Sequence, residues 1–248
     1  MTTYKEANFA VEINPFDFMF RFCFVLLFIT TLTSCGRKFK IDGVTSVSRL
    51  DGKMLFVKVL SGDELVNVDS AEVIHGYFQM EGKVDSVVLA SLYMDDECIM
   101  PLVLEEGNIK IEINNVGISI KGTPLNDSFN KFIEDKTAID DKAYEVEREE
   151  SRMIMDGVDI NTVQIEIEKK RAEVARQMDN LVQAFISSNY DNVLGPGVFI
   201  MIGNSLPYPF LTPVMEDIVD EAPEVFKNNN LVKNYLTLVK EYKDSMAD

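Results

Sequence analysis

The side chains that could support catalysis or metal binding are few and isolated in this sequence. His75 is the only histidine, and its context, IHG, is typical of a turn. A histidine-based metal centre or a Ser-His-Asp triad would therefore depend on this one residue. Residues 95–97, DDE, could attract a hard cation, but they lack the alternating spacing of a calcium-binding loop. We expect solvated turns at both places, and we expect no metal or cofactor site.

Two further features have a possible chemistry and a simpler structural reading. Glu105 and Glu106 are adjacent, and paired carboxylates can hydrolyse glycosides. In a chain with 41 acidic residues such pairs arise by chance, so we expect a solvated turn before Gly107. Cys98 lies in the apolar run ECIMPLVL, which favours a buried structural thiol over a reactive one. The chain has no C-x-x-C, phosphate-binding glycine loop or nucleophile elbow, so the sequence predicts a protein that is not an enzyme.

Cys35 has the surroundings of a lipid attachment site. The uncharged run at 22–32, FCFVLLFITTL, follows Arg21 and is shorter than the roughly 20 residues that span a bilayer, but it fits the apolar core of a signal peptide. Residues 32–35, LTSC, then resemble a lipobox, at which bacterial lipoproteins are cut and acylated. We expect residues 1–35 to be a signal peptide and the lipid bilayer to hold the chain through acylated Cys35. The alternative is a buried N-terminal helix with an incidental cysteine.

The segment before Met19 does not suit a signal peptide. It contains Glu6, Glu12 and Asp17, where a short basic segment is expected. Our hypothesis is that translation starts at Met19 and that residues 1–18 precede the true start. After Cys35 the sequence GRKFKID has basic residues before the first acid, at Asp42. This basic cluster either lies against anionic head groups or is a solvated linker. In related Gram-negative bacteria an acidic cluster soon after the lipidated cysteine accompanies display on the cell surface. Its absence here resembles lipoproteins that stay on the periplasmic face of the outer membrane.

Composition narrows the class of partner. The formal net charge is −17, and no basic stripe is present that could release counterions from phosphates. We therefore expect no nucleic-acid partner. Cys98 is the single cysteine after Cys35, so no disulfide within the mature chain is expected.

Two kinds of hydrophobic period divide the mature chain. Residues 36–122 contain short runs rich in β-branched and aromatic residues, such as the alternating IKIEI at 109–113, separated by glycine-containing turns. Residues 123–248 begin with Thr123-Pro124, a helix start, and continue with apolar residues three and four apart. We predict an α+β fold, with an antiparallel β-sandwich or partly open barrel over 36–122. A long αα-hairpin follows, with a break at 156–157 and a second helix over about 161–188. We predict shorter helices after it, near 197–204, 211–221 and 229–244.

The tetrapeptide PYPF at 207–210 is a candidate contact surface. Prolines can hold the rings of Tyr208 and Phe210 outward at low entropic cost, and exposed aromatic residues anchor partners. The alternative is a packed loop between helices.

Several stretches together resemble one family of lipoproteins from Gram-negative bacteria. They are FKIDG at 39–43, VDSAEVIHGYFQMEGKV at 68–84, LVLEEGNIKIEI at 102–113 and VGISIKGTPLNDSFNKF at 116–132, while FISSNYDNVLGPGVFIM at 185–201 is similar to the family's helical connector. In that family a β-domain of unknown function precedes a thioredoxin-like domain with a W-C-x-x-C site. This sequence has no tryptophan and no C-x-x-C, so the resemblance does not carry redox activity to it.

Two functions remain open at this point. The first is a membrane-anchored, non-catalytic periplasmic lipoprotein that binds an envelope protein or another ligand through its β-domain or its projecting helices. The second is an accessory part of a thiol-redox pathway that works with a separate thioredoxin-like protein. We favour the first, because no residue constellation supplies a redox centre.

Overall fold

The computed structural model describes residues 36–62 and 64–246. They form two open four-stranded sheets followed by helices, which confirms the predicted α+β sandwich with a helical hairpin after it. Sheets and helices belong to one compact unit, Arg37–Asp248. The expected signal peptide, Met19 and Cys35 lie outside the described residues.

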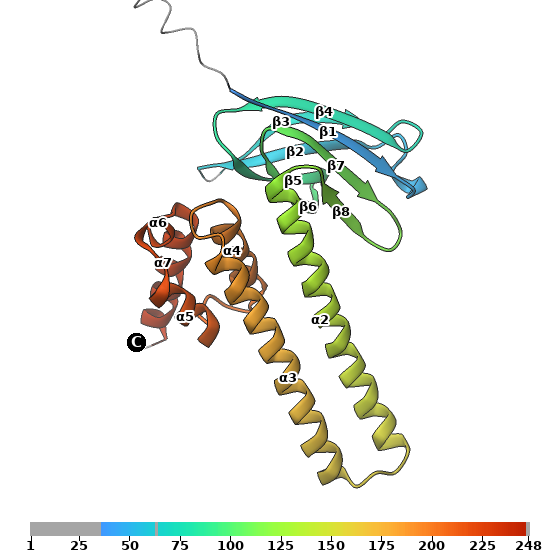
Figure 1. Ribbon diagram of the computed structural model, residues 1–248, viewed down its shortest axis with the longest axis vertical. Helices are drawn as coiled ribbons and strands as arrows, with labels where there is room; N and C mark the ends of the chain where they lie inside the picture. Colours follow the sequence, from blue (N-terminus) through green and yellow to red (C-terminus); the bar gives the residue numbers. More distant parts are fainter. Residues whose placement is uncertain (1–35, 63, 247–248) are drawn as a thin grey trace, which may run out of the picture. The chain divides into compact units, whose positions relative to one another are not determined.

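The two sheets divide the described strands equally (Figure 1). Sheet A has the order β4-β1-β7-β8, and sheet B has the order β3-β2-β5-β6. The strands are β1 (Arg37–Thr45), β2 (Met54–Ser61), β3 (Glu64–Glu72), β4 (Tyr77–Val84), β5 (Val88–Met94), β6 (Glu97–Leu104), β7 (Gly107–Ile113) and β8 (Ile118–Lys121).

β1 occupies an interior position in sheet A and differs from the predicted all-antiparallel pattern. It pairs antiparallel with β4 but parallel with β7, with Ile41 opposite both Met80 and Ile109. β1 and β7 are far apart in sequence, so a crossover through the other sheet joins them, as parallel pairing requires.

The core of the sandwich follows from the strict alternation along the strands. Phe39 and Ile41 of β1, with Ile109 and Ile111 of β7, point inward and are almost fully buried, while lysines occupy positions between them. Gly43 is required on β1, because a Cβ there would lie 2.0 Å from the ring of Phe78. The alternation predicted from IKIEI is therefore the physical basis of this layer.

The hairpin consists of α2 (Pro124–Met155) and α3 (Ile160–Ser187). α2 has 32 residues, so it is about 48 Å long at about 1.5 Å per residue. The chain reverses at Gly157, which has φ of 78°, and the predicted break at 156–157 is confirmed. Asp159 then caps α3 by accepting a hydrogen bond from the backbone N–H of Thr162 at 3.2 Å.

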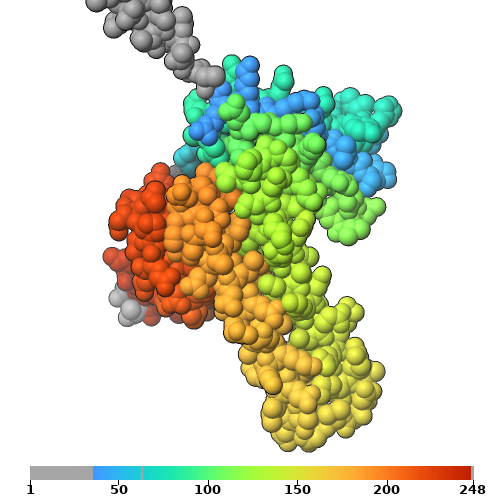
Figure 2. Space-filling view, in the orientation of Figure 1, coloured from blue at the N-terminus to red at the C-terminus, as the bar shows by residue number. Residues whose placement is uncertain are grey.

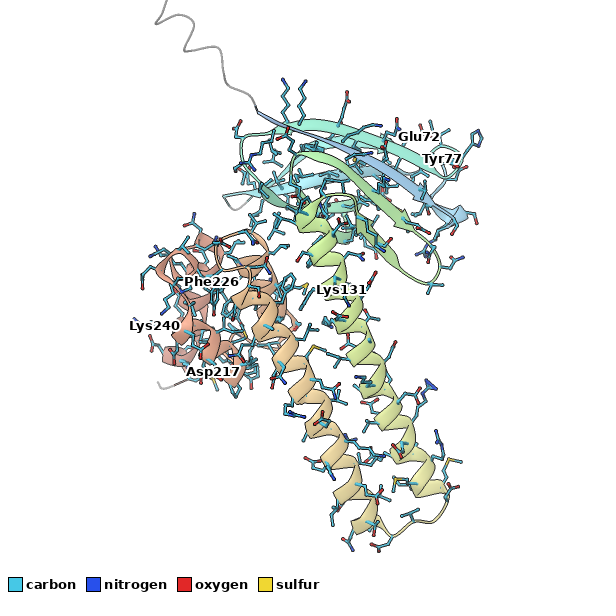
Figure 3. All side chains as sticks on the ribbon, viewed as in Figure 1. Glu72, Tyr77, Lys131, Asp217, Phe226 and Lys240 are labelled. Carbon is cyan, nitrogen blue, oxygen red and sulfur yellow. The ribbon has the colours of Figure 1, made fainter. Side chains whose placement is uncertain are left out.

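Four helices complete the fold beside the base of the hairpin. They are α4 (Leu194–Ser205), α5 (Pro213–Glu221), α6 (Glu224–Lys227) and α7 (Asn230–Ser245). Three match the predicted helices to within three residues at each end, and the short α6 was not predicted. The second hydrophobic core lies among them and includes Phe226 (Figure 3). Phe226 packs edge-on against Phe199 and Tyr190. Val103 of β6 joins this core, so sheet B contacts the sandwich core with one face and the helices with the other.

Candidate functional site

The isolated acids and the histidine lie on turns, as predicted. His75 is exposed in the turn before β4, with φ of 53°. Asp95 has φ of 54° in the exposed turn between β5 and β6. Within the described ranges no group of three or more His, Cys, Asp or Glu side chains is placed to hold a metal ion.

Cys98 corrects one prediction. It was expected in the core, but it is exposed near the start of β6. The pairing of β5 with β6 is irregular between Leu92 and Tyr93, and Cys98 is opposite Tyr93, close to the turn. The apolar run becomes buried only at Leu102. Cys98 thus lines a hollow of about 630 Å³ at one end of the sandwich. Partial burial is the main reason why the pKa of Tyr93 is raised, and the nearby Cys98 side chain raises this pKa further.

Glu105 corrects a second prediction. Its side chain is buried rather than solvated, and it accepts hydrogen bonds from the backbone N–H groups of Leu125 at 2.8 Å and Asn126 at 3.1 Å. These N–H groups belong to the first turn of α2, which has no intrahelical acceptors for them. The predicted cap residue Thr123 does precede α2, but its hydroxyl accepts from Asn126 Nδ2 instead of a backbone N–H.

Asn126 attaches α2 to the edge of sheet B. Its Oδ1 accepts from the N–H of Val103 at 2.9 Å, and its Nδ2 donates to the C=O of Val103 at 2.8 Å. One carboxamide therefore replaces the neighbouring strand that the edge strand β6 lacks on this side. Asn126 and Val103 are both fully buried.

A second asparagine bonds α2 to sheet A, through one hydrogen bond instead of two. Asn130 Oδ1 accepts from the N–H of Ile120 in β8 at 3.0 Å, and Asp127 Oδ1 accepts from the N–H of Gly122 at 2.8 Å. We call the set Glu105, Asn126, Asp127 and Asn130 the strand–helix joint. It binds the first turns of α2 to both sheets, so the hairpin is held at a defined angle to the sandwich. Sequence reasoning missed the joint, although the pattern N-D-x-x-N, one residue after Thr-Pro, was its visible signal.

The shaft of the hairpin is stabilised by charge and by a small core. Lys170 pairs with Glu149 and Arg171 pairs with Glu150, each pair joining α3 to α2. Beneath them Val146, Val163 and Ile167 form a separate buried cluster. Figure 2 shows the far half of the hairpin standing clear of the sheets and of the other helices.

The end of the hairpin is apolar and exposed. Ile154, Met155, Val158 and Ile160, which we call the hairpin tip, have exposed fractions of 52%, 86%, 38% and 52%. They fall within seven consecutive residues, together with the exposed Asp156 and Asp159. Single exposed apolar residues are ordinary on protein surfaces, but a group of this kind on a projecting element is typical of a contact surface.

A groove of about 810 Å³ lies between sheet B and the helices. Its floor is the outer face of β2 and β5, including Leu60 and Leu89, and its walls come from α4 and the start of α7. The helix α4 can approach the sheet closely because Gly197 has no side chain, and a Cβ there would lie 2.2 Å from Leu89. The part of sheet B next to this contact forms the floor of the groove.

The predicted contact residues at 207–210 are in different environments. Tyr208 is half exposed and stacks on Tyr242, with ring centroids 5.3 Å apart. Phe210 is partly buried, and its carbonyl accepts a hydrogen bond from the Tyr235 hydroxyl at 2.9 Å. The rings of Tyr208 and Phe210 lie 5.1 Å apart, so they form one small aromatic surface.

Comparison with known proteins finds a family match for part of the chain. Residues 39–129 match the family model described as Domain of unknown function (DUF4369). The match confirms the resemblance seen in the β-domain, and it covers three of the four residues of the strand–helix joint, ending at Phe129 just before Asn130. No curated protein matches the chain. None of the helices within the described ranges combines the length and the apolar character that crossing a bilayer requires.

Proposed function

We propose that this chain is a non-catalytic adaptor of the bacterial envelope, held on the outer membrane through acylated Cys35 and facing the periplasm. It binds a partner protein through the hairpin tip. The observation that carries the proposal is the hairpin tip itself, a group of four exposed apolar side chains at the end of a hairpin with a charged surface. Such a group gains free energy when a partner buries it.

The first strand, which follows the proposed anchor in sequence, begins far from the hairpin tip (Figure 2). Gly36 alone separates Cys35 from Arg37, the start of β1, so only two residue steps, about 7 Å of chain, lie between the acylated residue and the first strand. The exposed Arg37 and Lys38 would each add about 1 kcal/mol of attraction to an anionic surface, whereas Lys40 already pairs with Asp42. Figure 2 shows the start of β1 and the hairpin end on opposite sides of the described unit, so the tip would point away from the bilayer.

The charge of the hairpin indicates the chemistry of the partner. Residues 124–187 contain fifteen acidic and nine basic residues, and Asp156 and Asp159 lie within the tip. Two hairpins of the same chain would repel each other, whereas an apolar pocket bordered by lysine or arginine would attract the tip. A basic-rimmed pocket on another protein is therefore the surface that this tip fits.

The test is a crosslinking pull-down of the lipidated protein from native membranes, read by mass spectrometry. The double variant Met155→Ser/Ile160→Ser is compared with Val116→Ser/Leu238→Ser, which removes two exposed apolar side chains elsewhere. Two central contact residues at more than about 1 kcal/mol each predict about 30-fold weaker capture for the tip variant. Both variants should keep wild-type stability, because the four side chains are exposed.

The outcomes separate the possible roles. A stoichiometric partner that the tip variant loses and the control variant retains supports the adaptor, and a Cys35→Ser form should lose it from the membrane fraction. If that partner carries a C-x-x-C thioredoxin fold, the chain is an accessory component of a thiol-redox pathway. Equal capture by wild type and by the tip variant would refute the proposal.

A further inference from the structure

The groove beside sheet B has the composition of a small-molecule site. Its volume of about 810 Å³ lies within the roughly 300–1,000 Å³ that such sites occupy. Leu60 and Leu65 on the neighbouring strands β2 and β3, both about half exposed, form one side, and Ile200 and Met201 of α4 form the other. Leu60 and Leu65 stay about half in water unless a ligand covers them, and Ile200 and Met201 are partly exposed. The groove is separate from the hairpin tip, so its role does not rest on the adaptor function.

The charge of the described residues that line the groove is opposite in sign to the charge of the chain. The chain carries a formal charge of −17, but none of the described residues that line the groove is acidic. Lys58 supplies the single cationic side chain of this described lining. Its Nζ lies 4.7 Å from the ring centroid of Tyr93 and 5.6 Å from that of Phe56, and no carboxylate of the described residues pairs with it.

The rings of Phe56 and Tyr93 lie outside the lining of the groove, so their contacts hold the ammonium group of Lys58 at the edge of the groove. A cation–π contact orients a lysine without neutralising it, so its charge remains available to a ligand. Asn230 and Asn234, exposed on the first turns of α7, add amide groups to the lining. The groove thus combines aliphatic walls with a cation and neutral amide donors.

We propose that the groove binds a fatty carboxylate, a single aliphatic chain with one anionic head. The aliphatic chain of the ligand lies against the aliphatic walls, and its carboxylate lies at the ammonium group of Lys58. A cationic amphiphile would meet Lys58 with like charge, and a neutral alcohol would gain the apolar contact but not the ionic one. The groove therefore selects the anionic head among amphiphiles of equal chain length.

Isothermal titration calorimetry on the full chain carrying Cys35→Ser, which has no acyl groups of its own, tests this assignment. The probes are decanoate, decanol and decyltrimethylammonium, which share one chain length and differ in head charge. We expect one decanoate per chain and at least tenfold weaker binding of the other two probes. Each methylene added between octanoate and decanoate should tighten binding about fourfold, because burying one contributes about 0.8 kcal/mol.

Two variants locate the site. Lys58→Gln should weaken decanoate binding about tenfold and leave decanol unchanged, since a hydrogen bond to a charged group contributes about 1.5–3 kcal/mol. Lys53→Gln, an exposed lysine outside the groove, is the matched control and should bind as wild type. Leu65→Glu places a carboxylate at an exposed position of the groove and should abolish decanoate binding without unfolding the chain.

The proposal fails on any of three results. They are equal affinity for the three probes, the same decanoate affinity in Lys58→Gln and wild type, and no decanoate binding at millimolar concentration. Sedimentation that shows two chains associating through the groove, with dissociation in Leu65→Glu, would assign the groove to a second copy and would also overturn it.

Discussion

Replacing Asn126 by alanine should separate the hairpin from the sheet it is bonded to. The substitution removes the carboxamide that both accepts from and donates to the backbone of Val103. Val103 is fully buried, so neither of its backbone groups can turn to water. A buried polar group left without a partner costs about 1–3 kcal/mol, and two of them predict a loss of about 4 kcal/mol.

The size of this effect is measurable by urea denaturation and by thermal melting. For a unit of this size about 1 kcal/mol corresponds to about 2–4 °C in melting temperature, so Asn126→Ala should melt about 8–16 °C lower. Asn115→Ala, in an exposed turn, removes a carboxamide with no hydrogen bond among the described residues and should melt as wild type. Amide hydrogen exchange supplies a local readout, because the N–H of Val103 should lose protection before the sheet unfolds.

A small effect would refute the reasoning. If Asn126→Ala loses less than about 1 kcal/mol, the bonds to Val103 are not what holds α2 on sheet B, and packing of Phe129 and Phe132 must hold it instead. The same conclusion follows if the N–H of Val103 keeps its wild-type protection in the variant.

Three further predictions follow from single sites. Gly122→Ala should lower the free energy of unfolding in urea by more than about 1 kcal/mol. Gly122 has φ of 103°, and a Cβ there would lie 2.5 Å from the carbonyl oxygen of Asn108. Gly117 has open space around it, so Gly117→Ala should leave the stability unchanged. Cys98 should react with a maleimide in the folded chain at the rate of an exposed thiol, and Cys98→Ser should lose that label; protection until urea is added would contradict its exposure. Burial raises the pKa of Tyr235, so the unfolded chain releases this proton first, and stability should fall as pH rises above the ordinary tyrosine value of about 10. Tyr235→Phe should cost about 1 kcal/mol at neutral pH, from the bond to Phe210, and should show a smaller alkaline loss in melting curves.

The sequence predicted the helices and strands well, because each depends on the spacing of apolar residues along its own segment. The alternation in IKIEI became β7, and the spacing of Phe129, Phe132 and Ile133 became the buried face of α2. Pairing partners are not a local property, which is why the interior place of β1 and its parallel neighbour β7 were not foreseen. The burial of Glu105 also depends on the distant first turn of α2 that it caps.

One of the candidate sites could be predicted from the sequence, and the other could not. The projecting hairpin could be read from two long helical periods and a glycine, so its exposed tip was within reach of the sequence. The groove was not, because Leu60, Leu89 and Met201 come from three separate segments that no periodicity links. Cys98 was misplaced because an apolar neighbourhood in sequence does not fix where in a strand burial begins.

The interior place of β1 has a mechanical consequence. If the chain is anchored through Cys35, as proposed, a pull from the membrane enters the fold at the start of β1. That strand has eight residue pairs with β4 on one side and seven with β7 on the other. A force along the strand must shear both ladders together, whereas an edge strand could be peeled away one pair at a time. Rupture under force is governed by the unfolding rate, so this position of the first strand favours a tether that withstands load.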